Sequence, residues 1–523
     1  MSRIKEFFKS QTYPALLLAF TVMGLIIFFA GRMHWIFIEI TLGYEGFLHL
    51  LFPVLVVNSV LLCVLTLLRQ KKLTGEEKWY LALLTLSSAF SIFTIIFAIV
   101  YTIISLTGES EHAILLYLKN SLLIAGFLVF VPFSVLFLPN FKQKTRKVIT
   151  AVLLAITLLV GIFNILPVIP YEITSEPSVI DNGTEYSVVF STNDYGTGYV
   201  EYNYNGKDYK VYDEMGGRLN SDSKIHSISV PYEHLRNNTY SVGSTRVYEQ
   251  YSYGSHRGKT VDSGEYLFKY NDSETQTFLV VSDWHTELSD AYEAISNLGD
   301  YDSVILLGDS SPGVDFEEEV VKNIVEFAGE VSKGAKPVIY ARGNHETRGQ
   351  YAGKILDSLG LNEFYYTTDI GPYSFIVLDS GEDKEDSHPE YGGMNNYGQY
   401  RADMMEWMKT VNFENDKVIA ISHSWTLCDV EKELSEKGWN ELDRLGTRLI
   451  LSGHTHQCRL LGSTESEDEL SMLSAHPDII GYMDGGKSDG GYVASRMTLS
   501  PDGFTLEAYN NNGEQVFDQN FEW

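Results

Sequence analysis

The chain has 523 residues, 45% of them hydrophobic, and its 68 Asp and Glu against 39 Lys and Arg give a formal net charge of −29. This acidic balance argues against nucleic acid as a routine partner, because an acidic surface repels the phosphate backbone. Three cysteines make no disulfide framework, and buried free thiols are the simpler account of Cys63, Cys428 and Cys458.

The first 170 residues are dominated by apolar runs, each long enough to cross a bilayer as a helix. The runs cover residues 12–31, 46–68, 79–106, 113–138 and 148–168. We therefore predict an all-α transmembrane bundle of five helices over residues 1–170, in contact with the lipid bilayer. The spans are nearly free of ionisable residues, which favours an anchor, with a sensory or small-lipid role as the alternative.

Basic residues predict the orientation of these helices. Eleven Lys and Arg fall in the N-terminal tail and in the loops after the second and fourth runs, whereas Arg32 and Lys119 fall on the other side. The N-terminus is therefore expected in the cytoplasm and residues 171–523 outside. Residues 1–170 hold 13 Lys and Arg and 7 Asp and Glu, which leaves 26 and 61 of the chain's 39 and 68 for the rest. We predict a multi-pass cell-membrane protein with an acidic extracytoplasmic part.

Residues 171–270 change to short, alternating, tyrosine-rich stretches separated by turn formers. The clearest of these are residues 186–191, 198–204, 224–230 and 266–270. Their spacing predicts one small β-sandwich of about 100 residues. Its aromatic side chains could bind carbohydrate, but aromatic residues are also ordinary strand formers.

Residues 271–523 alternate apolar, strand-like runs with helical stretches, which predicts an α/β domain. The helical stretches cover residues 287–297, 316–333, 353–359, 401–410 and 430–445, and the chain returns to β at 492–499 and 503–509. Five apolar runs stop at polar motifs: Asp283-Trp-His285, Gly308-Asp309, Gly343-Asn344-His345-Glu346, His423 and Gly453-His454-Thr-His456. Strand ends form the ligand crevice of α/β sheets, so we expect these side chains to gather into a metal site.

This ordered set of motifs resembles the calcineurin-like metallophosphoesterase superfamily over residues 278–523. With the preceding β-sandwich, the chain is similar to purple acid phosphatases, in which a fibronectin-III-like module precedes the catalytic domain. The resemblance implies an αββα sandwich, with two sheets flanked by helices. Purple acid phosphatases carry Gly and an iron-binding Tyr where this chain has His285 and Pro312, so a tyrosinate–iron chromophore is not expected.

The resemblance also implies two metal ions, Mn, Fe or Zn, between which the ligand types alone do not choose. Three residues would hold the first ion and three the second, with Asp309 as the bridge. The first set is Asp283, His285 and His456, and the second is Asn344, His423 and His454. A carboxylate suits the bridge because its two oxygens can be shared between cations.

By the same resemblance, the catalytic residue His345 would lie beside the leaving-group oxygen, as its proton donor or as a stabiliser of the transition state, and Glu346 would orient it. Candidate substrate contacts are Arg342, Arg348 and, in the long segment 379–400, His388. We expect a metal-dependent phosphoric ester hydrolase that cleaves phosphomonoesters by in-line attack of a metal-bridging hydroxide. The alternatives are a phosphodiesterase or pyrophosphatase acting on a nucleotide or lipid-linked substrate, and a phosphate-binding sensor without turnover.

Overall fold

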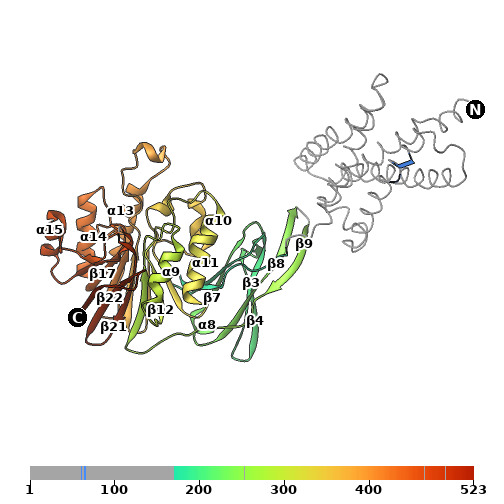
Figure 1. Cartoon of the computed structure of the whole chain (residues 1–523), viewed down its shortest axis with the longest axis horizontal. Helices are drawn as coiled ribbons and strands as arrows, with labels where there is room; N and C mark the ends of the chain where they lie inside the picture. Colours follow the sequence, from blue (N-terminus) through green and yellow to red (C-terminus); the bar gives the residue numbers. More distant parts are fainter. Residues whose placement is uncertain (1–60, 62–63, 66–169, 252–253, 465, 489) are drawn as a thin grey trace, which may run out of the picture. The chain divides into compact units, whose positions relative to one another are not determined.

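A computed structural model describes Leu61, Val64, Leu65 and residues 170–523, apart from 252–253, 465 and 489 (Figure 1). Residues 171–250 and 257–523 together form one compact unit. Within this unit the described strands form sheets of ten, six, five and two strands.

The predicted fold class needs a correction at its first part, the all-α transmembrane bundle of five helices. Among the described residues, none of the helices is long and apolar enough to cross a membrane. What is described is a mixture of strands and helices, so the bundle is not supported. The five predicted spans lie almost wholly outside the described residues. The predicted membrane location and the extracytoplasmic catalytic part stay predictions.

The largest sheet has the strand order β23, β22, β21, β11, β12, β13, β1, β2 and β7, with β20 paired to β21. These strands span Gln515–Glu522 (β23), Gly503–Asn510 (β22), Gly491–Leu499 (β21), Gln276–Val281 (β11), Ser303–Leu306 (β12), Pro337–Tyr340 (β13), Ser178–Asp181 (β1), Tyr186–Ser191 (β2), Ile225–Val230 (β7) and Gly486–Ser488 (β20). The central strands β11, β12, β13 and β1 are parallel, and β21 and β2 flank them as antiparallel neighbours.

The six-stranded sheet has the order β14, β15, β16, β17, β19 and β18. Its strands span Tyr366–Ile370 (β14), Tyr373–Leu378 (β15), Val418–Ser422 (β16), Thr447–Ser452 (β17), Ile480–Met483 (β19) and Arg459–Leu460 (β18). β15, β16, β17 and β19 are parallel. Both sheets therefore bring the carboxyl ends of several strands to one edge.

Helices cover the outer faces of the two sheets (Figure 1). On the ten-stranded sheet lie Leu288–Ser296 (α9), Glu317–Val320 (α10), the π-helical turn Val321–Val325 (η1) and Glu326–Ser332 (α11). The other helices are Tyr232–Leu235 (α8), Ile355–Ser358 (α12), Tyr397–Met408 (α13), Lys432–Arg444 (α14) and Glu467–Ala475 (α15), with 3-10 turns at His345–Thr347 (η2), Ala352–Lys354 (η3) and Pro389–Tyr391 (η4).

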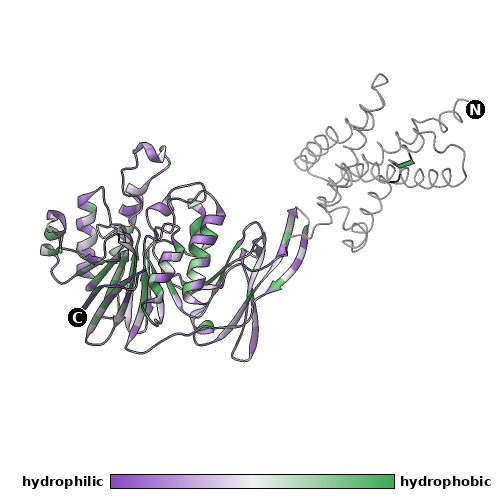
Figure 2. Cartoon of the chain, in the orientation of Figure 1, coloured by the Kyte–Doolittle hydropathy of each residue, from purple (hydrophilic) through white to green (hydrophobic). Residues whose placement is uncertain are grey.

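The core between the two sheets follows from the alternation of side chains along each strand. Phe375 and Val377 of β15 point to the ten-stranded sheet, where the rings of Phe375 and Phe278 lie 5.2 Å apart. Ile376 and Leu378 point the other way and pack with residues of α13 and α14. Hydrophobic residues accordingly follow the strands, whereas loops are mostly hydrophilic (Figure 2).

Residues 171–270 form two layers of strands around their own apolar cluster. One layer is β10 (Tyr266–Leu267), β8 (Thr239–Tyr251), β3 (Gly196–Tyr204) and β4 (Lys207–Tyr212), with β9 (Gly254–Asp262) paired to β8. Two short strands, β5 (Glu214–Met215) and β6 (Arg218–Leu219), pair with each other. The other layer is β1, β2 and β7, which belong to the ten-stranded sheet.

The joint between this module and the catalytic part is the parallel pair β1–β13, in which Val179 lies opposite Pro337. A fibronectin-III-like module standing apart from the catalytic domain is therefore not supported, because one of its layers continues the catalytic sheet. The predicted domain boundary between residues 270 and 271 stays a prediction.

Candidate metal centre

The polar motifs follow parallel strands at the edge where the carboxyl ends of both sheets meet. Asp283 comes after β11, Asp309 after β12 and Asn344 after β13, and His423 and His454 come after β16 and β17. Backbone hydrogen bonds join these loops: the amide of Asp283 donates to the carbonyl of Gly308, and that of Gly453 donates to the carbonyl of His423. Loops of the two sheets meet here, because the amide of His454, after β17, donates to Oδ2 of Asp283, after β11, at 2.9 Å. We call the space among these donor loops the crevice.

Three overlapping groups of possible metal ligands lie in this crevice. They are Asp283, His285 and His456; His285, Asp309 and His345; and Asp309, His423 and His454. Within each group the ligand atoms lie within 4.8 Å of one another. The first group has the same residues as the first predicted set. The third group contains His423 and His454 of the second predicted set together with Asp309. Asn344 lies next to it, with its Oδ1 3.2 Å from Nδ1 of His454.

The Asp309 side chain lies between the two sets. Its Oδ1 accepts a hydrogen bond from the amide of His345 at 2.9 Å. Its Oδ2 lies 3.2 Å from Nε2 of His423, 3.8 Å from Nε2 of His345 and 3.9 Å from Nε2 of His285. Asp309 therefore lies close to histidines of both predicted sets.

Backbone carbonyls fix the rings of three histidines. Nδ1 of His423 lies 2.7 Å from the carbonyl oxygen of Leu307, that of His345 lies 2.9 Å from Pro312, and that of His456 contacts Lys487. A carbonyl only accepts, so each Nδ1 carries the proton and Nε2 faces the carboxylates. Ligand histidines are held by such carbonyls in known metal sites.

The backbone of the donor loops is strained. Asp283, His285, Asp309, His454 and His456 all have φ between 37° and 68°, a region that residues other than glycine rarely adopt. Such strain persists only where the surrounding structure enforces it, and it gathers at functional sites. Gly343 keeps the crevice narrow, because a Cβ there would clash with Oδ1 of Asp309.

Two buried polar atoms in the crevice show that the residues fit a metal ion. Oδ1 of Asp283 and Nε2 of His423 are buried and complete no hydrogen bond. Oδ1 of Asp283 lies 3.6 Å from Nε2 of His456 and 3.9 Å from Nε2 of His285. Buried polar atoms without a partner are costly, and a cation between these oxygen and nitrogen donors would satisfy them.

The pKa shifts of the histidines in the crevice also agree with a metal site. Burial lowers the pKa of His285 and of His454, which favours the neutral imidazole that binds metals. Burial would also lower the pKa of His423, but the charge of Asp309 raises it to about 10. The carboxylates thus attract positive charge into the part of the crevice that is most deeply buried.

The resemblance implied that Glu346 orients the ring of His345, but the carboxylate of Glu346 makes other contacts. Its buried carboxylate accepts hydrogen bonds from the amides of Asp309, Ser310 and Gly343 and from the hydroxyl of Ser310. It therefore joins the loops after β12 and β13. The carbonyl of Pro312 orients His345 instead.

The three candidate substrate contacts lie in different surroundings. Arg342 is buried against Phe364 and paired with Asp379, so the geometry does not support a phosphate contact. His388 caps the turn η4, where its Nδ1 accepts from the amide of Glu390. Arg348 lies beside the ring of His345, with Nη1 3.4 Å from Nε2 and 3.5 Å from Nδ1.

Two residues that hold the donor loops in place, Asp484 and Lys487, were not predicted from the sequence. Oδ2 of Asp484 accepts from the hydroxyl of Ser282 at 2.9 Å, directly before Asp283. The carbonyl of Lys487 contacts Nδ1 of His456, and the amide of Lys487 donates to the carbonyl of Asp283 at 3.1 Å. Neither residue lies in a motif, and a backbone carbonyl leaves no signal in a sequence. Burial raises the pKa of Asp484 to about 7.

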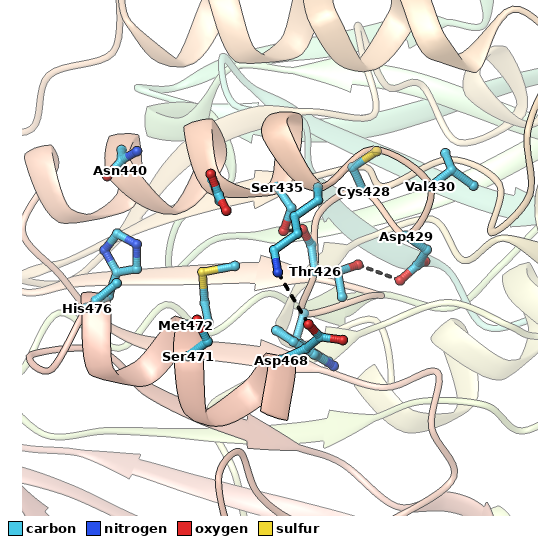
Figure 3. A pocket seen from close by; sticks show the side chains of 14 residues that line it. Thr426, Cys428, Asp429, Val430, Ser435, Asn440, Asp468, Ser471, Met472 and His476 are labelled. Carbon is cyan, nitrogen blue, oxygen red and sulfur yellow. Dashed lines mark hydrogen bonds and ion pairs between the residues drawn. The ribbon is translucent and has the colours of Figure 1, made fainter. Parts of the chain in front are cut away.

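A pocket of about 400 Å³ lies between α14 and α15 (Figure 3). The segment after His423 forms one of its ends, where Thr426 and Asp429 point toward each other, and Met472 and His476 line another part. None of the predicted metal ligands lines it. The pocket and the crevice therefore share one loop, but they are separate sites.

The segment that carries the crevice is similar to a known family. Residues 276–458 match the family model of the calcineurin-like phosphoesterases. This range contains all five motifs. No curated protein is significantly similar to the chain in sequence.

The solved structures that match the chain include three proteins. A conserved protein of Streptococcus pneumoniae, described as a predicted phosphoesterase, has 12% identity and a TM-score of 0.24 over 48% of this chain and 99% of its own. Vacuolar Protein Sorting 29 of Cryptosporidium parvum has 13% identity and 0.26 over 48% and 100%. A metallophosphoesterase of Sphaerobacter thermophilus has 15% identity and 0.23 over 47% and 89%.

The family match and the donor cluster lead to the same conclusion. Residues 276–458 match the calcineurin-like phosphoesterase family model, and the chain is a metal-dependent phosphoric ester hydrolase.

Proposed function

We propose that the chain hydrolyses phosphomonoesters at a site whose residues would hold two metal ions. Asp283, His285 and His456 would hold one ion, Asn344, His423 and His454 would hold the other, and Asp309 would be shared between them. The observation that carries the proposal is the position of Asp309, whose Oδ2 lies within 3.9 Å of histidines from both sets. Mn, Fe and Zn all suit these oxygen and imidazole donors.

The donors and their supports prepare the crevice for an anionic substrate. Metal ions held by these donors would supply Lewis acidity for the phosphate oxygens and would lower the pKa of a water. The carbonyl contacts and the carboxylate of Glu346 hold the side chains in place before substrate arrives. A preorganised arrangement avoids the cost of reorganisation during reaction.

His345 is proposed as the proton donor. Its side chain is 26% exposed, so it can reach both the donor cluster and a substrate that enters from solvent. With Nδ1–H fixed on Pro312, the protonated ring presents Nε2–H and releases that proton to the leaving-group oxygen. General acid catalysis of this kind contributes about 100- to 10,000-fold.

The deciding experiment measures turnover by the purified full-length chain with Mn, Fe or Zn. The substrates are an aryl phosphate monoester and the matching diester. We expect faster turnover of the monoester, loss of activity with metal retained in His345→Ala, and loss of both in Asp309→Asn. His234→Ala is the matched control, because this histidine stacks on Tyr204 away from the crevice.

Two other outcomes would redirect the proposal. Preference for the diester would favour a phosphodiesterase, and cleavage of pyrophosphate alone would favour a pyrophosphatase. Two bound metals without turnover of any ester would favour a phosphate-binding sensor. The exposed position of His345 beside the donors favours catalysis, since binding alone needs no proton donor.

A further inference from the structure

Glu382, in the segment 379–400, links two parts of the molecule that sequence reasoning treated separately. Its side chain is buried and accepts four hydrogen bonds. The hydroxyl of Thr347 donates at 2.6 Å, Nε of Arg348 at 2.9 Å, Nη2 of Arg348 at 2.8 Å and the hydroxyl of Tyr391 at 2.8 Å. Two of these donor residues belong to the turn that begins at His345, and the third belongs to the segment itself.

This carboxylate fixes the guanidinium of Arg348. A bidentate pair of arginine and carboxylate sets both the position and the plane of the guanidinium. Nη1 takes no part in the pair and lies beside both ring nitrogens of His345. The ring is thus held between Arg348 on one side and the carbonyl of Pro312 on another.

The base of the segment is itself rigid. Nη1 of the buried Arg401 donates to the carbonyls of Ser380 and Glu382 at 3.2 and 3.0 Å. Asp386 accepts from the amides at the start of α13, including that of Tyr397 at 2.8 Å. Glu382 is therefore anchored through its backbone, and its side chain can transmit that rigidity to the turn at His345.

Two carboxylates already pair with the positive charge of Arg348. Glu382 pairs with it at 2.8 Å and Asp383 at 3.1 Å. A guanidinium paired in this way offers little free charge to a phosphate. Its position beside the imidazole is the property that the pair preserves.

We propose that Glu382 is a positioning residue, which holds Arg348 against His345 and so keeps the imidazole where it protonates the leaving group. The inference rests on the proposed function for its effect on catalysis. Its structural part, that Glu382 restrains the ring of His345, stands on the contacts alone.

Leaving groups of different acidity test the catalytic part. An ester of a weakly acidic alcohol needs protonation, whereas p-nitrophenolate leaves without it. In Glu382→Gln we expect kcat for phenyl phosphate to fall about 10- to 100-fold, as for other supporting contacts, and kcat for p-nitrophenyl phosphate to change little. Glu382→Asp, which keeps the charge, should recover part of the loss. Equal losses on both esters would overturn the inference.

Chemical modification tests the structural part without any turnover. Diethyl pyrocarbonate acylates imidazole nitrogens, and peptide mass spectrometry reports the rate at His345 separately from other histidines. We expect a several-fold faster reaction of His345 in Glu382→Gln and in Arg348→Met than in the wild type. An unchanged rate in both variants would overturn the inference.

A matched control separates this effect from general loosening. Glu469 is a buried carboxylate with a bidentate pair to Arg459, at 2.8 and 2.6 Å, and it lies in α15. Glu469→Gln should change neither the leaving-group dependence nor the labelling of His345. If the wild type turns over no ester, the proposed function fails, and the labelling rates alone decide whether Glu382 holds the ring.

Discussion

Two buried aspartates differ in their pKa shifts: Asp309 lies in the donor crevice, and Asp181 lies in the module formed by residues 171–270. Asp309 and Asp181 are exposed by only 2% and 1%. Burial would raise the pKa of Asp309, but His423 and His345 lower it well below its usual range. At Asp181 burial raises the pKa, and the hydroxyl of Tyr232 and the amide of Gly183 offset it only in part.

The opposite pKa shifts of the two aspartates distinguish a candidate binding site, around Asp309, from a structural part of the molecule, around Asp181. A buried carboxylate is costly unless cations or strong donors surround it. Around Asp309 the chain gathers imidazoles that can bind metal, whereas Oδ2 of Asp181 completes no hydrogen bond. Burial thus leaves Asp181 with a raised pKa, whereas the histidines of the crevice lower the pKa of Asp309.

The largest effect is expected from Asp309→Asn. An amide oxygen carries no charge and cannot be shared between cations as a carboxylate can, so the variant should lose metal. Supporting contacts alone change activity about 10- to 100-fold, so the loss should exceed about 100-fold. Turnover and metal content by mass spectrometry measure it. Asp181→Asn is the matched comparison, and an equal loss there would remove the distinction between the two regions.

A methyl group at Gly343 should have almost as large an effect. The Cβ of Gly343→Ala would clash with Oδ1 and the amide of Asp309, so the carboxylate must move. We expect metal affinity and turnover to fall about 10-fold or more. Gly353→Ala is the control, because a Cβ there meets nothing within 4 Å. Unchanged metal affinity in Gly343→Ala would show that the position of Asp309 is not critical.

Removal of metal ions by a chelator should lower the Tm of the chain, because the ions are expected to bind only in the crevice of the folded state. A ligand that binds only the folded state at 100 times its dissociation constant stabilises it by about 2.7 kcal/mol. For a unit of this size, that corresponds to a fall in Tm of about 4 °C. Thermal unfolding with and without chelator measures the shift, which Mn or Zn should reverse. Asp309→Asn should show a smaller shift, and Asp181→Asn the full one.

The sequence predicted the donors because each stands next to an apolar strand. Asp283, Asp309 and His423 follow buried strands of four to six residues, so their motifs mark the edge of a sheet. The stretch predicted at 186–191 coincides with β2 (Tyr186–Ser191). Local patterns therefore sufficed wherever the structure is set by neighbours in the chain.

Contacts between distant residues were not predictable in this way. The parallel pairing of β1 with β13 joins Ile180 to Val338, and no periodicity reports such a partner. Glu382 likewise looked like any acidic residue in a loop, although it is buried under Arg348 and Tyr391. Helix α15 (Glu467–Ala475) was missed, since most of its side chains are exposed and its apolar pattern is weak.

The smallest predicted effect concerns stability and pH at Asp181. Its pKa is raised in the folded chain by burial, whereas in the unfolded chain it is about 3.9. As pH rises above that value, the unfolded state loses its proton first, and the stability of the wild type falls until the folded pKa is passed. Asparagine does not titrate, so the Tm of Asp181→Asn should rise relative to the Tm of the wild type as pH rises from about 4 to 8. Asp502→Asn, at an exposed position, should show no such trend. A constant difference in Tm between Asp181→Asn and the wild type over this range would mean that Asp181 is charged in the fold, like Asp309.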